Sequence, residues 1–212
     1  MKSFLLFLVF LLLGLFIAMS YQYWNINLLT LNTRPEITTK FSLKNAPTES
    51  LPASVATISG NVNWQSRTVA KSVPLKMYQK IQQGEEISTG ANGKAGIRIQ
   101  NDAVFLLQHN AHVSIIQLLP VNFVFMQDKG EVEYADTIRV PVSVRSLDLV
   151  SIITNGNVII TVDQNKQKVT VVVLKGNVKE GYEDLQNNND VMDLNAGQTF
   201  IFDEANKVGT VQ

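Results

Sequence analysis

Two histidines lie close together in the sequence and are the side chains most readily considered as metal ligands. His109 and His112 are the only histidines of the chain and belong to the segment QHNAH. In an extended strand, side chains three residues apart point to opposite faces, whereas in a turn they could converge. A zinc or copper site needs three or four ligands, and Asp102 could supply a third only if the fold brought it close. The sequence therefore favours a polar turn, and we expect no metal site and no cofactor.

Acid–base chemistry would need carboxylates that face each other. The chain has neighbouring carboxylates at Glu85-Glu86, Glu183-Asp184 and Asp203-Glu204. Neighbours in an extended chain face apart, so none of these forms a ready acid–base pair. Serine, histidine and aspartate occur without a G-x-S-x-G nucleophile elbow. We predict that the protein is not an enzyme and has no catalytic residues.

A glycine-rich stretch, GEEISTGANGKAGIRIQ, invites comparison with loops that bind phosphate. It contains Gly84, Gly90, Gly93 and Gly96, but no Gly-Lys-Ser/Thr, and no helix pattern follows on which a phosphate could sit. These glycines are therefore expected to serve turns and close packing in a β-sheet.

Composition excludes further classes of function. The chain has 212 residues, 45% of them hydrophobic and 17% charged, with 18 basic and 18 acidic residues, and it contains no cysteine. A net charge of zero gives no electrostatic reason to bind nucleic acid. The absence of cysteine excludes disulfides, thiolate metal sites and a cysteine-linked lipid anchor.

The N-terminus carries an apolar run typical of a membrane segment. Phe4–Met19 contains no charged residue and, as a helix, would extend roughly 24 Å, slightly less than the hydrocarbon core of a bilayer. Aromatic residues suited to the headgroup region follow at Tyr21, Tyr23 and Trp24. We predict that residues 1–24 are a signal anchor; a signal peptide with Ala18 and Ser20 before the cleavage site is the alternative. In either case the remaining chain lies outside the cytoplasm.

Residues 25–54 are predicted to be a linker or stalk. This part is rich in threonine, asparagine and serine and contains Pro35, Pro47 and Pro52, with at most one short strand around Ile37–Leu43. Only Met1, Lys2 and Ser3 precede the apolar run, so we expect no cytoplasmic domain.

From about Val55 onward, short strands separated by turn residues replace the earlier pattern. Alternating or continuous runs of valine, isoleucine, threonine and phenylalanine predict an all-β domain over residues 55–204, followed by a tail over 205–212. The spacing indicates an antiparallel β-sandwich, a jelly roll or a partly solenoidal fold. Thr68–Gln83 is the best helix candidate, although Pro74 weakens it. The predicted strands are 97–100, 103–107, 113–118, 123–126, 132–134, 138–144, 150–153, 158–162, 169–174 and 200–202.

Turn residues separate these strands. Asn92-Gly93 and Asn155-Gly156 predict two-residue hairpins, and Asp128-Lys129-Gly130 and Gln164-Asn165-Lys166 predict slightly longer ones. A glycine, a polar residue and a valine also recur in SGNVNW, KGEVEY, NGNVII and KGNVKE, which indicates a repeated way of starting a strand. The residues assigned to structural turns are Gly84, Gly90, Asn92, Gly93, Gly96, Gly130, Asn155, Gly156, Gly176 and Gly197.

Two further features are candidates for contact with other molecules. Gly181–Asp190 is a polar segment between strands and is predicted to be a loop with a possible contact surface. Trp64 is the one tryptophan of the β-domain and is expected to anchor the core or a sheet edge.

The stretch GEEISTGANGKAGIRIQNDAVFLLQHNAHVSI resembles the characteristic segment of the FecR domain family. That family carries a G-D-x-I-x-T-G element, a small-residue turn, and strands that end in D-G-S-like and N-S-like turns. ATISGNVNW upstream, and GEVEY, VTVVVLKGNVKE and LNAGQTFIF downstream, follow in the family's order, so the resemblance covers about residues 56–202. Ala103 stands where the family has glycine, and the family's G-T-x-F element is not recognisable. The matching residues are Gly84, Ile87, Thr89, Gly90, Ala95, Ile97, Asp102 and Asn110.

The resemblance implies an extracytoplasmic β-domain of the bacterial envelope. Well-known FecR proteins carry an anti-sigma segment in the cytoplasm, which we expect to be absent here. We predict a non-catalytic, single-pass inner-membrane protein whose periplasmic domain binds another envelope protein in signalling. The alternative is an inner-membrane jelly roll that handles envelope lipid or glycan, as in lipopolysaccharide transport, and holds acyl chains in an apolar groove.

Overall fold

The computed structural model describes residues 49–100, 103–136 and 140–212. Every regular element in these ranges is a strand, which confirms the predicted all-β class. The predicted membrane segment Phe4–Met19, the expected strand at Ile37–Leu43 and Asp102 lie outside the described residues. Among the residues that are described, no helix has the length and apolar character needed to cross a membrane.

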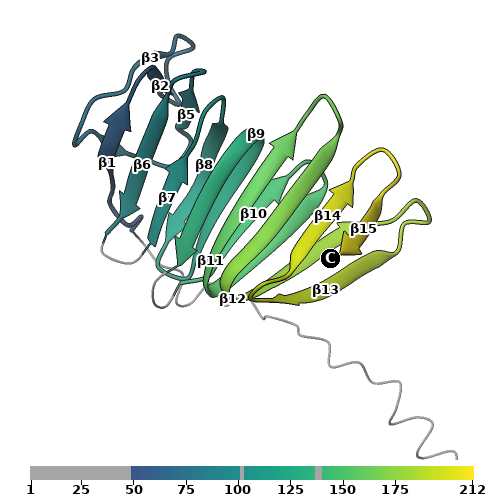
Figure 1. Cartoon of the computed structure of the whole chain (residues 1–212). Coiled ribbons are helices and arrows are strands. Elements are labelled where there is room, and N and C mark those ends of the chain that lie inside the picture. The colour runs from purple at the N-terminus through teal and green to yellow at the C-terminus, as the bar shows by residue number, and fades with distance from the viewer. Residues whose placement is uncertain (1–48, 101–102, 137–139) are drawn as a thin grey trace, which may run out of the picture. The chain divides into compact units, whose positions relative to one another are not determined.

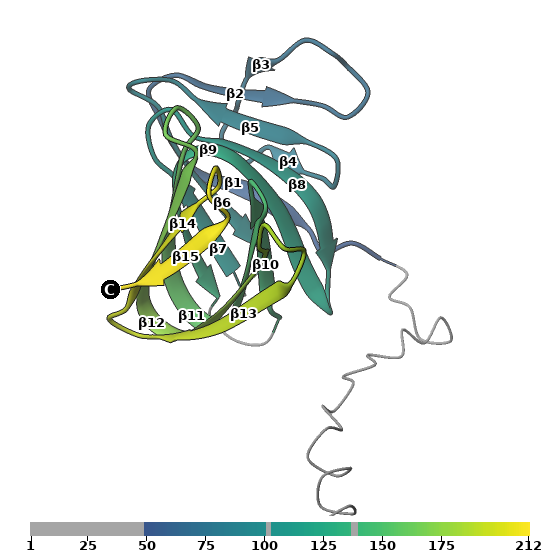
Figure 2. The ribbon, with the colours of Figure 1, turned by 90° about the vertical axis from the view of Figure 1, so that its right-hand side faces the viewer.

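The strands form one open sheet that is folded into two layers (Figure 1, Figure 2). Layer 1 contains β4 (Lys80–Ile81), β1 (Ala53–Ser59), β6 (Lys94–Ile99), β7 (Ala103–Leu107), β14 (Thr199–Asp203) and β15 (Val208–Val211). Layer 2 contains β3 (Val73–Pro74), β2 (Val62–Gln65), β5 (Glu86–Thr89), β8 (His112–Leu119), β10 (Val142–Ser146) and β13 (Asn189–Asn195). The long strands β9 (Asn122–Asp136), β11 (Leu149–Asp163) and β12 (Lys168–Glu183) contribute one half to each layer.

The pairing of β9 and β12 shows how a strand serves both layers. The first half of β9 pairs with β8 and, in parallel, with β10, whereas its second half pairs with β7 and β11. β12 begins beside β14 in layer 1 and ends beside β13 in layer 2. Apart from β9–β10, the described pairings are antiparallel, which agrees with the predicted antiparallel sandwich.

Glycines bend these shared strands where the chain changes layer. Gly130 in β9 and Gly176 in β12 have φ values of 82° and 78°, in the left-handed region that favours glycine. A Cβ would stand 2.7 Å from the backbone nitrogen of Ala111 at Gly130, and 2.7 Å from the Cα atom of Gly156 at Gly176. The backbone must come this close for one strand to join both layers.

The predicted hairpins at Asp128-Lys129-Gly130 and Asn155-Gly156 are not formed, and both assignments need correction. The first segment lies inside β9, and the second lies inside β11, where the pairing register with β12 shifts. Gly176 likewise lies inside β12. Local sequence shows that the chain must bend, but whether a bend reverses the strand depends on the partners on each side.

The recurring glycine–polar–valine motif marks a change of layer. Gly60 lies between β1 in layer 1 and β2 in layer 2, and the other three copies lie at the bends of β9, β11 and β12. The predicted hairpin at Asn92-Gly93 is also corrected, since it connects β5 in layer 2 to β6 in layer 1, which do not pair. There the N–H of Gly93 donates to the carbonyl of Gly90 over 2.9 Å.

The remaining turn assignments fall in several places. Gly84 lies in the turn between β4 and β5, and Gly197 in the turn between β13 and β14. Gln164-Asn165-Lys166 lies in the hairpin turn between β11 and β12. Gly96 is not in a turn: it lies inside β6, where a Cβ would stand 3.0 Å from Leu106.

Strand positions agree with the predicted segments better than strand lengths do. The segments 123–126 and 132–134 are parts of the single strand β9, and 150–153 and 158–162 are parts of β11. Thr68–Gln83 contains the short strands β3 and β4 in place of the helix considered from sequence. β15 lies within the segment expected to be a C-terminal tail and pairs with β14.

Aromatic residues fill the space between the layers. Phe105, Phe125 and Tyr134 are buried, with ring centroids 4.8–6.4 Å apart, and Tyr134 donates a hydrogen bond to Gln127. Phe200 and Phe202 form a second buried group near the C-terminus with the half-buried Tyr182. These two groups form part of the core that holds the layers together.

Candidate functional site

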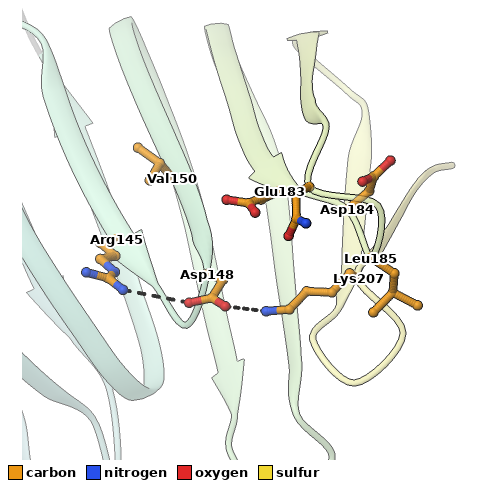
Figure 3. Close-up of a pocket in the computed structure, with 8 residues that line it drawn as sticks. Arg145, Asp148, Val150, Glu183, Asp184, Leu185 and Lys207 are labelled. Carbon is orange, nitrogen blue, oxygen red and sulfur yellow. Dashed lines mark hydrogen bonds and ion pairs between the residues drawn. The ribbon is translucent and has the colours of Figure 1, made fainter.

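A charged cleft lies where three turns of the C-terminal half meet (Figure 3). One turn connects β10 to β11, the second connects β12 to β13, and the third connects β14 to β15. The third turn belongs to layer 1 and the other two to layer 2, so the cleft spans both layers. We call it the C-terminal cleft; it has a volume of about 500 Å³ and is lined by Arg145, Asp148, Val150, Glu183, Asp184, Leu185, Asn187 and Lys207.

Lys207 connects the turns on the two layers. Its ammonium group donates hydrogen bonds to the carboxylates of Asp148 and Glu204. The backbone N–H of Asp148 donates to the other carboxylate oxygen of Glu204 over 3.0 Å. Arg145 adds a longer ion pair to Asp148 at 3.7 Å. Together these contacts tie the β10–β11 turn to the β14–β15 turn, and Figure 3 shows Asp148 between the two cations.

The network sets the charge states inside the cleft. The hydrogen bond from Lys207 lowers the pKa of Asp148. Partial desolvation opposes the charge on Lys207, but the hydrogen bonds to Asp148 and Glu204 prevail and raise its pKa. Both groups therefore remain charged across the physiological range.

The β12–β13 loop is organised by one aspartate. Asp184 Oδ1 accepts hydrogen bonds from the backbone N–H groups of Gln186 and Asn188, each over 2.8 Å, and Oδ2 accepts one from the Asn188 side chain. These bonds lower the pKa of Asp184. The predicted loop Gly181–Asp190 is shorter than expected, because β12 extends to Glu183 and β13 begins at Asn189. Leu185 at its tip is 65% exposed.

The cleft contains both paired charges and side chains that are exposed to solvent. Asp148 and Lys207 largely neutralise each other, whereas Glu183 and Leu185 are exposed toward solvent. The loop predicted as a contact surface thus forms one wall of the cleft.

A carboxyl group is buried in the neighbouring part of β12. Glu180 is fully buried on the inner face of layer 2, and the Ser151 hydroxyl donates to its Oε2 over 2.7 Å. Burial raises the pKa of Glu180 to about 8, so this carboxyl is mostly protonated at neutral pH. Its Oε1 and the hydroxyl of buried Ser146 have no hydrogen-bonding partner among the residues that the structure describes.

The two histidines do not converge. His112 lies in β8 and contacts two carboxylates, with Nε2 3.3 Å from Glu86 and Nδ1 3.0 Å from Asp128. His109 lies in the exposed turn before β8. No group of three ligand side chains suited to a metal occurs in the described ranges.

The members of two neighbouring carboxylate pairs have different contacts, whereas Glu183 and Asp184 both line the C-terminal cleft. Glu85 is buried and accepts a hydrogen bond from the indole N–H of Trp64 over 2.9 Å, whereas Glu86 contacts His112. Trp64 is partly buried and packs against the core from β2. Glu204 joins the Lys207 network, whereas Asp203 lies 3.9 Å from Lys168.

Sequence reasoning did not identify Asp148, Lys207 or Glu180. Lys207 and Asp148 are 59 residues apart, and no local pattern relates them. Glu180 does have a signal in the sequence, because it shares one face of β12 with Val178 and Tyr182, which lie two residues before and after it. A charged residue in an inward position of an alternating strand is the pattern that could have identified it.

Comparisons with known proteins find structures with a similar fold, but they identify no family for this chain. No protein-family model matches the chain, and no curated protein matches it. Two crystal structures of a "putative anti-sigma factor" from Parabacteroides distasonis share the fold, with 15% and 16% sequence identity and a TM-score of 0.51 in each case. The similarity covers 60% of this chain and 58% of the length of that protein. At this level of identity the comparison shows the likeness of fold alone.

Proposed function

We propose that this protein is a non-catalytic, membrane-tethered module of the bacterial envelope that binds another envelope protein in signalling. The observation that carries this proposal is the shared fold with a protein described as a "putative anti-sigma factor". The apolar segment Phe4–Met19 supports an anchor in the inner membrane, with the β-domain in the periplasm. Binding by surface contact fits a cleft whose charged groups are mostly paired with one another.

The FecR-type assignment is part of this proposal, and contacts of the matching residues support it. The Thr89 hydroxyl donates to the carbonyl of Gln108 over 2.6 Å and accepts from the N–H of Ala111 over 2.8 Å. The N–H of Asn110 donates to the carbonyl of Gly90 over 3.1 Å. Three of the residues that carry the resemblance, Thr89, Gly90 and Asn110, therefore join β5 to the turn before β8, as expected for a motif that maintains a fold.

The alternative, lipid or glycan handling, has only the two-layer architecture in its favour. It would need an apolar groove between the layers, but Phe105, Phe125 and Tyr134 fill one part of this space and Phe200 and Phe202 fill another. Mass spectrometry of the purified full chain distinguishes the two functions. Lipid-free protein is expected, and stoichiometric co-purified lipid would favour the alternative.

Site-specific photo-cross-linking in intact bacteria tests the proposed function. In one variant a photoreactive residue replaces Leu185 at the C-terminal cleft. In the control variant the same photoreactive residue replaces Tyr78, which is 80% exposed in the connection between β3 and β4. An adduct with a defined envelope protein is expected at position 185 and not at position 78. Failure to recover any envelope protein, both from these variants and from chemical cross-linking of the full chain, would refute the proposal.

A further inference from the structure

The outer edges of the folded sheet differ in how much unpaired backbone they present. The outermost strands are β4 and β15 in layer 1, and β3 and β13 in layer 2. β4 and β3 contain two residues each, and β3 includes Pro74, so both are poor templates for an added strand. β15 has four residues and β13 has seven, which leaves the two C-terminal edges as the longer ones.

The edge of β15 is partly closed by a side chain from the other layer. Thr199 and Gln212 exchange two backbone hydrogen bonds, so alternation along the ladder directs the N–H of Gly209 away from β14. This N–H donates to the Tyr182 hydroxyl over 3.2 Å. A strand added to β15 would have to displace Tyr182.

Among the described residues, nothing pairs with the outer edge of β13 over three of its residues. The N–H of Asp184 donates to the carbonyl of Asn188, which sets the alternation along the β12–β13 ladder. The N–H and C=O groups that point away from β12 therefore belong to Asn189, Val191 and Asp193. Farther along, the outward N–H of Asn195 donates to the Gln198 side chain over 2.7 Å, which ends the open row.

The side chains of β13 define what an added strand would meet. Asp190 is paired with Tyr182 of β12 and lies on one face of the sheet. Asp193 lies on the opposite face, 3.6 Å from Lys179. Between them are Met192 and Val191, and the latter is 64% exposed. β13 carries two aspartates and no lysine or arginine, and Lys179 of β12 offsets one of these charges, so the edge keeps a net negative charge.

A second copy of this chain is a poor occupant of the edge. Antiparallel pairing of β13 with itself about its centre, Met192, would place Asp190 opposite Leu194 and Asp193 opposite Val191 of the other copy, so neither aspartate would meet a basic residue. A strand with basic residues opposite both aspartates would have the complementary charge. Asp190 and Asp193 are three positions apart, so the two basic residues of the added strand must have the same spacing. No two basic residues of this chain are three positions apart.

We propose that the β13 edge binds an extended segment of a partner protein that carries two basic residues flanking two apolar ones, (Lys/Arg)-apolar-apolar-(Lys/Arg). The basic residues lie opposite Asp190 and Asp193, and the apolar residues lie opposite Val191 and Met192. Backbone hydrogen bonds to Val191 and Asp193 hold the strand, and the side chains select it. This inference rests on the proposed function and names the chemistry of its partner.

A peptide titration of the full chain in detergent tests the proposal. The probe is a blocked peptide, Thr-Lys-Val-Ile-Lys-Thr, and its control is Thr-Glu-Val-Ile-Glu-Thr. NMR is expected to show binding of the basic peptide only, with slower amide exchange at Val191 and Asp193 and little change at Asp190 and Met192, whose N–H groups already face β12. Equal binding of both peptides, or no binding of the basic one, would overturn the proposal.

Proline substitutions separate backbone pairing from charge. Val191→Pro removes an outward N–H while leaving the β12–β13 hydrogen bonds in place, and it should weaken binding of the basic peptide by about tenfold or more. Val211→Pro is the matched control, because its N–H also points outward, but from β15. Unchanged affinity in the Val191 variant, or equal loss in both variants, would show that β13 is not the docking edge.

Charge reversal gives a second, independent measurement. The double variant Asp190→Lys, Asp193→Lys should prefer the acidic peptide by about tenfold, since two opposite-charge pairs are exchanged for like-charge pairs. A retained preference for the basic peptide would contradict the assigned register. Circular dichroism of each variant verifies that the sheet is intact.

Cross-linking with the Val191→Pro variant distinguishes failure of this inference from failure of the proposed function. If the wild-type chain and this variant capture the same envelope protein equally, docking at β13 is wrong and the proposed function stands. If the wild-type chain captures no envelope protein, the proposed function fails, and the peptide titration still decides whether β13 accepts a strand.

Discussion

Glu180 shows how one residue can link stability to pH. It is fully buried, its partner is the neutral Ser151 hydroxyl, and its pKa rises to about 8. In the unfolded chain the carboxyl would ionise near its ordinary value of about 4.3. Between these two values the folded state binds a proton that the unfolded state has lost, so the free energy of unfolding must fall as pH rises.

We predict that Glu180→Gln removes this pH dependence. The wild-type chain should lose stability from about pH 4.3 to about pH 8, by an amount on the order of a few kcal/mol. The variant should lose less, because its side chain does not ionise. Urea unfolding across this range measures both, and Glu183→Gln, at an exposed position of the same strand, is the control. A difference between wild type and variant that stays constant with pH would refute the assignment.

Lys207 is the second residue with a testable role, because it joins the turns of the two layers. Lys207→Met leaves the Asp148 and Glu204 carboxylates without their shared cation. We expect the free energy of unfolding to fall by up to about 1 kcal/mol, and less at high salt, because charged groups near the surface are screened. Urea unfolding at low and high salt measures the effect.

The matched control for Lys207 is Lys166→Met in the β11–β12 hairpin. Within the described ranges Lys166 forms one ion pair, 3.3 Å from Asp163 of the same turn, and its side chain is 75% exposed. It should contribute less than Lys207. An equal loss in the two variants would mean that the connection between layers adds no stability.

Bent strands are the elements that distinguish this fold from a simple sandwich. β9, β11 and β12 each pair with one set of neighbours before a bend and another set after it. The bends require close approach of backbone, as at Gly176, where a Cβ would stand 2.7 Å from the Cα atom of Gly156. The two layers are therefore connected through continuous strands as well as through side-chain packing.

Two glycines of β12 test the importance of this bend. Gly176→Ala should lower the free energy of unfolding by roughly 2–4 kcal/mol, because it combines a positive φ with a backbone overlap. Gly181→Ala is the control: an added Cβ meets nothing closer than 4.0 Å, so little change is expected. Thermal or urea unfolding compares them, and similar losses at both positions would contradict the special role of the bend.

At the scale of the whole molecule, the proposed topology makes one prediction for the β-domain and another for the N-terminal apolar segment. The proposed topology puts the β-domain on the periplasmic side, so protease added to spheroplasts is expected to digest the β-domain and to leave a short membrane-embedded N-terminal fragment. Mass spectrometry of the membrane fraction identifies that fragment and distinguishes an anchor from a cleaved signal peptide. A β-domain protected from protease until the inner membrane is lysed would refute the topology.

The sequence by itself determined where the strands from β6 to β12 and β14 lie, and where the chain must bend. Alternation with period two and enrichment in valine, isoleucine and phenylalanine are local properties, so the regions around β6, β7, β8 and β14 could be predicted without a structure. The glycines at 130 and 176 were likewise identified as special positions, because only local backbone geometry is needed to single them out.

Tertiary structure alone decided what each bend does and which residues meet. Asn155-Gly156 could reverse a strand or pass it to another layer, and the choice depends on partners that are distant in sequence. The same holds for Asp148 and Lys207, 59 residues apart, whose contact exists only because two turns end at the same cleft. Strand pairing is a relation between segments, and alternation within a single segment does not specify its partner.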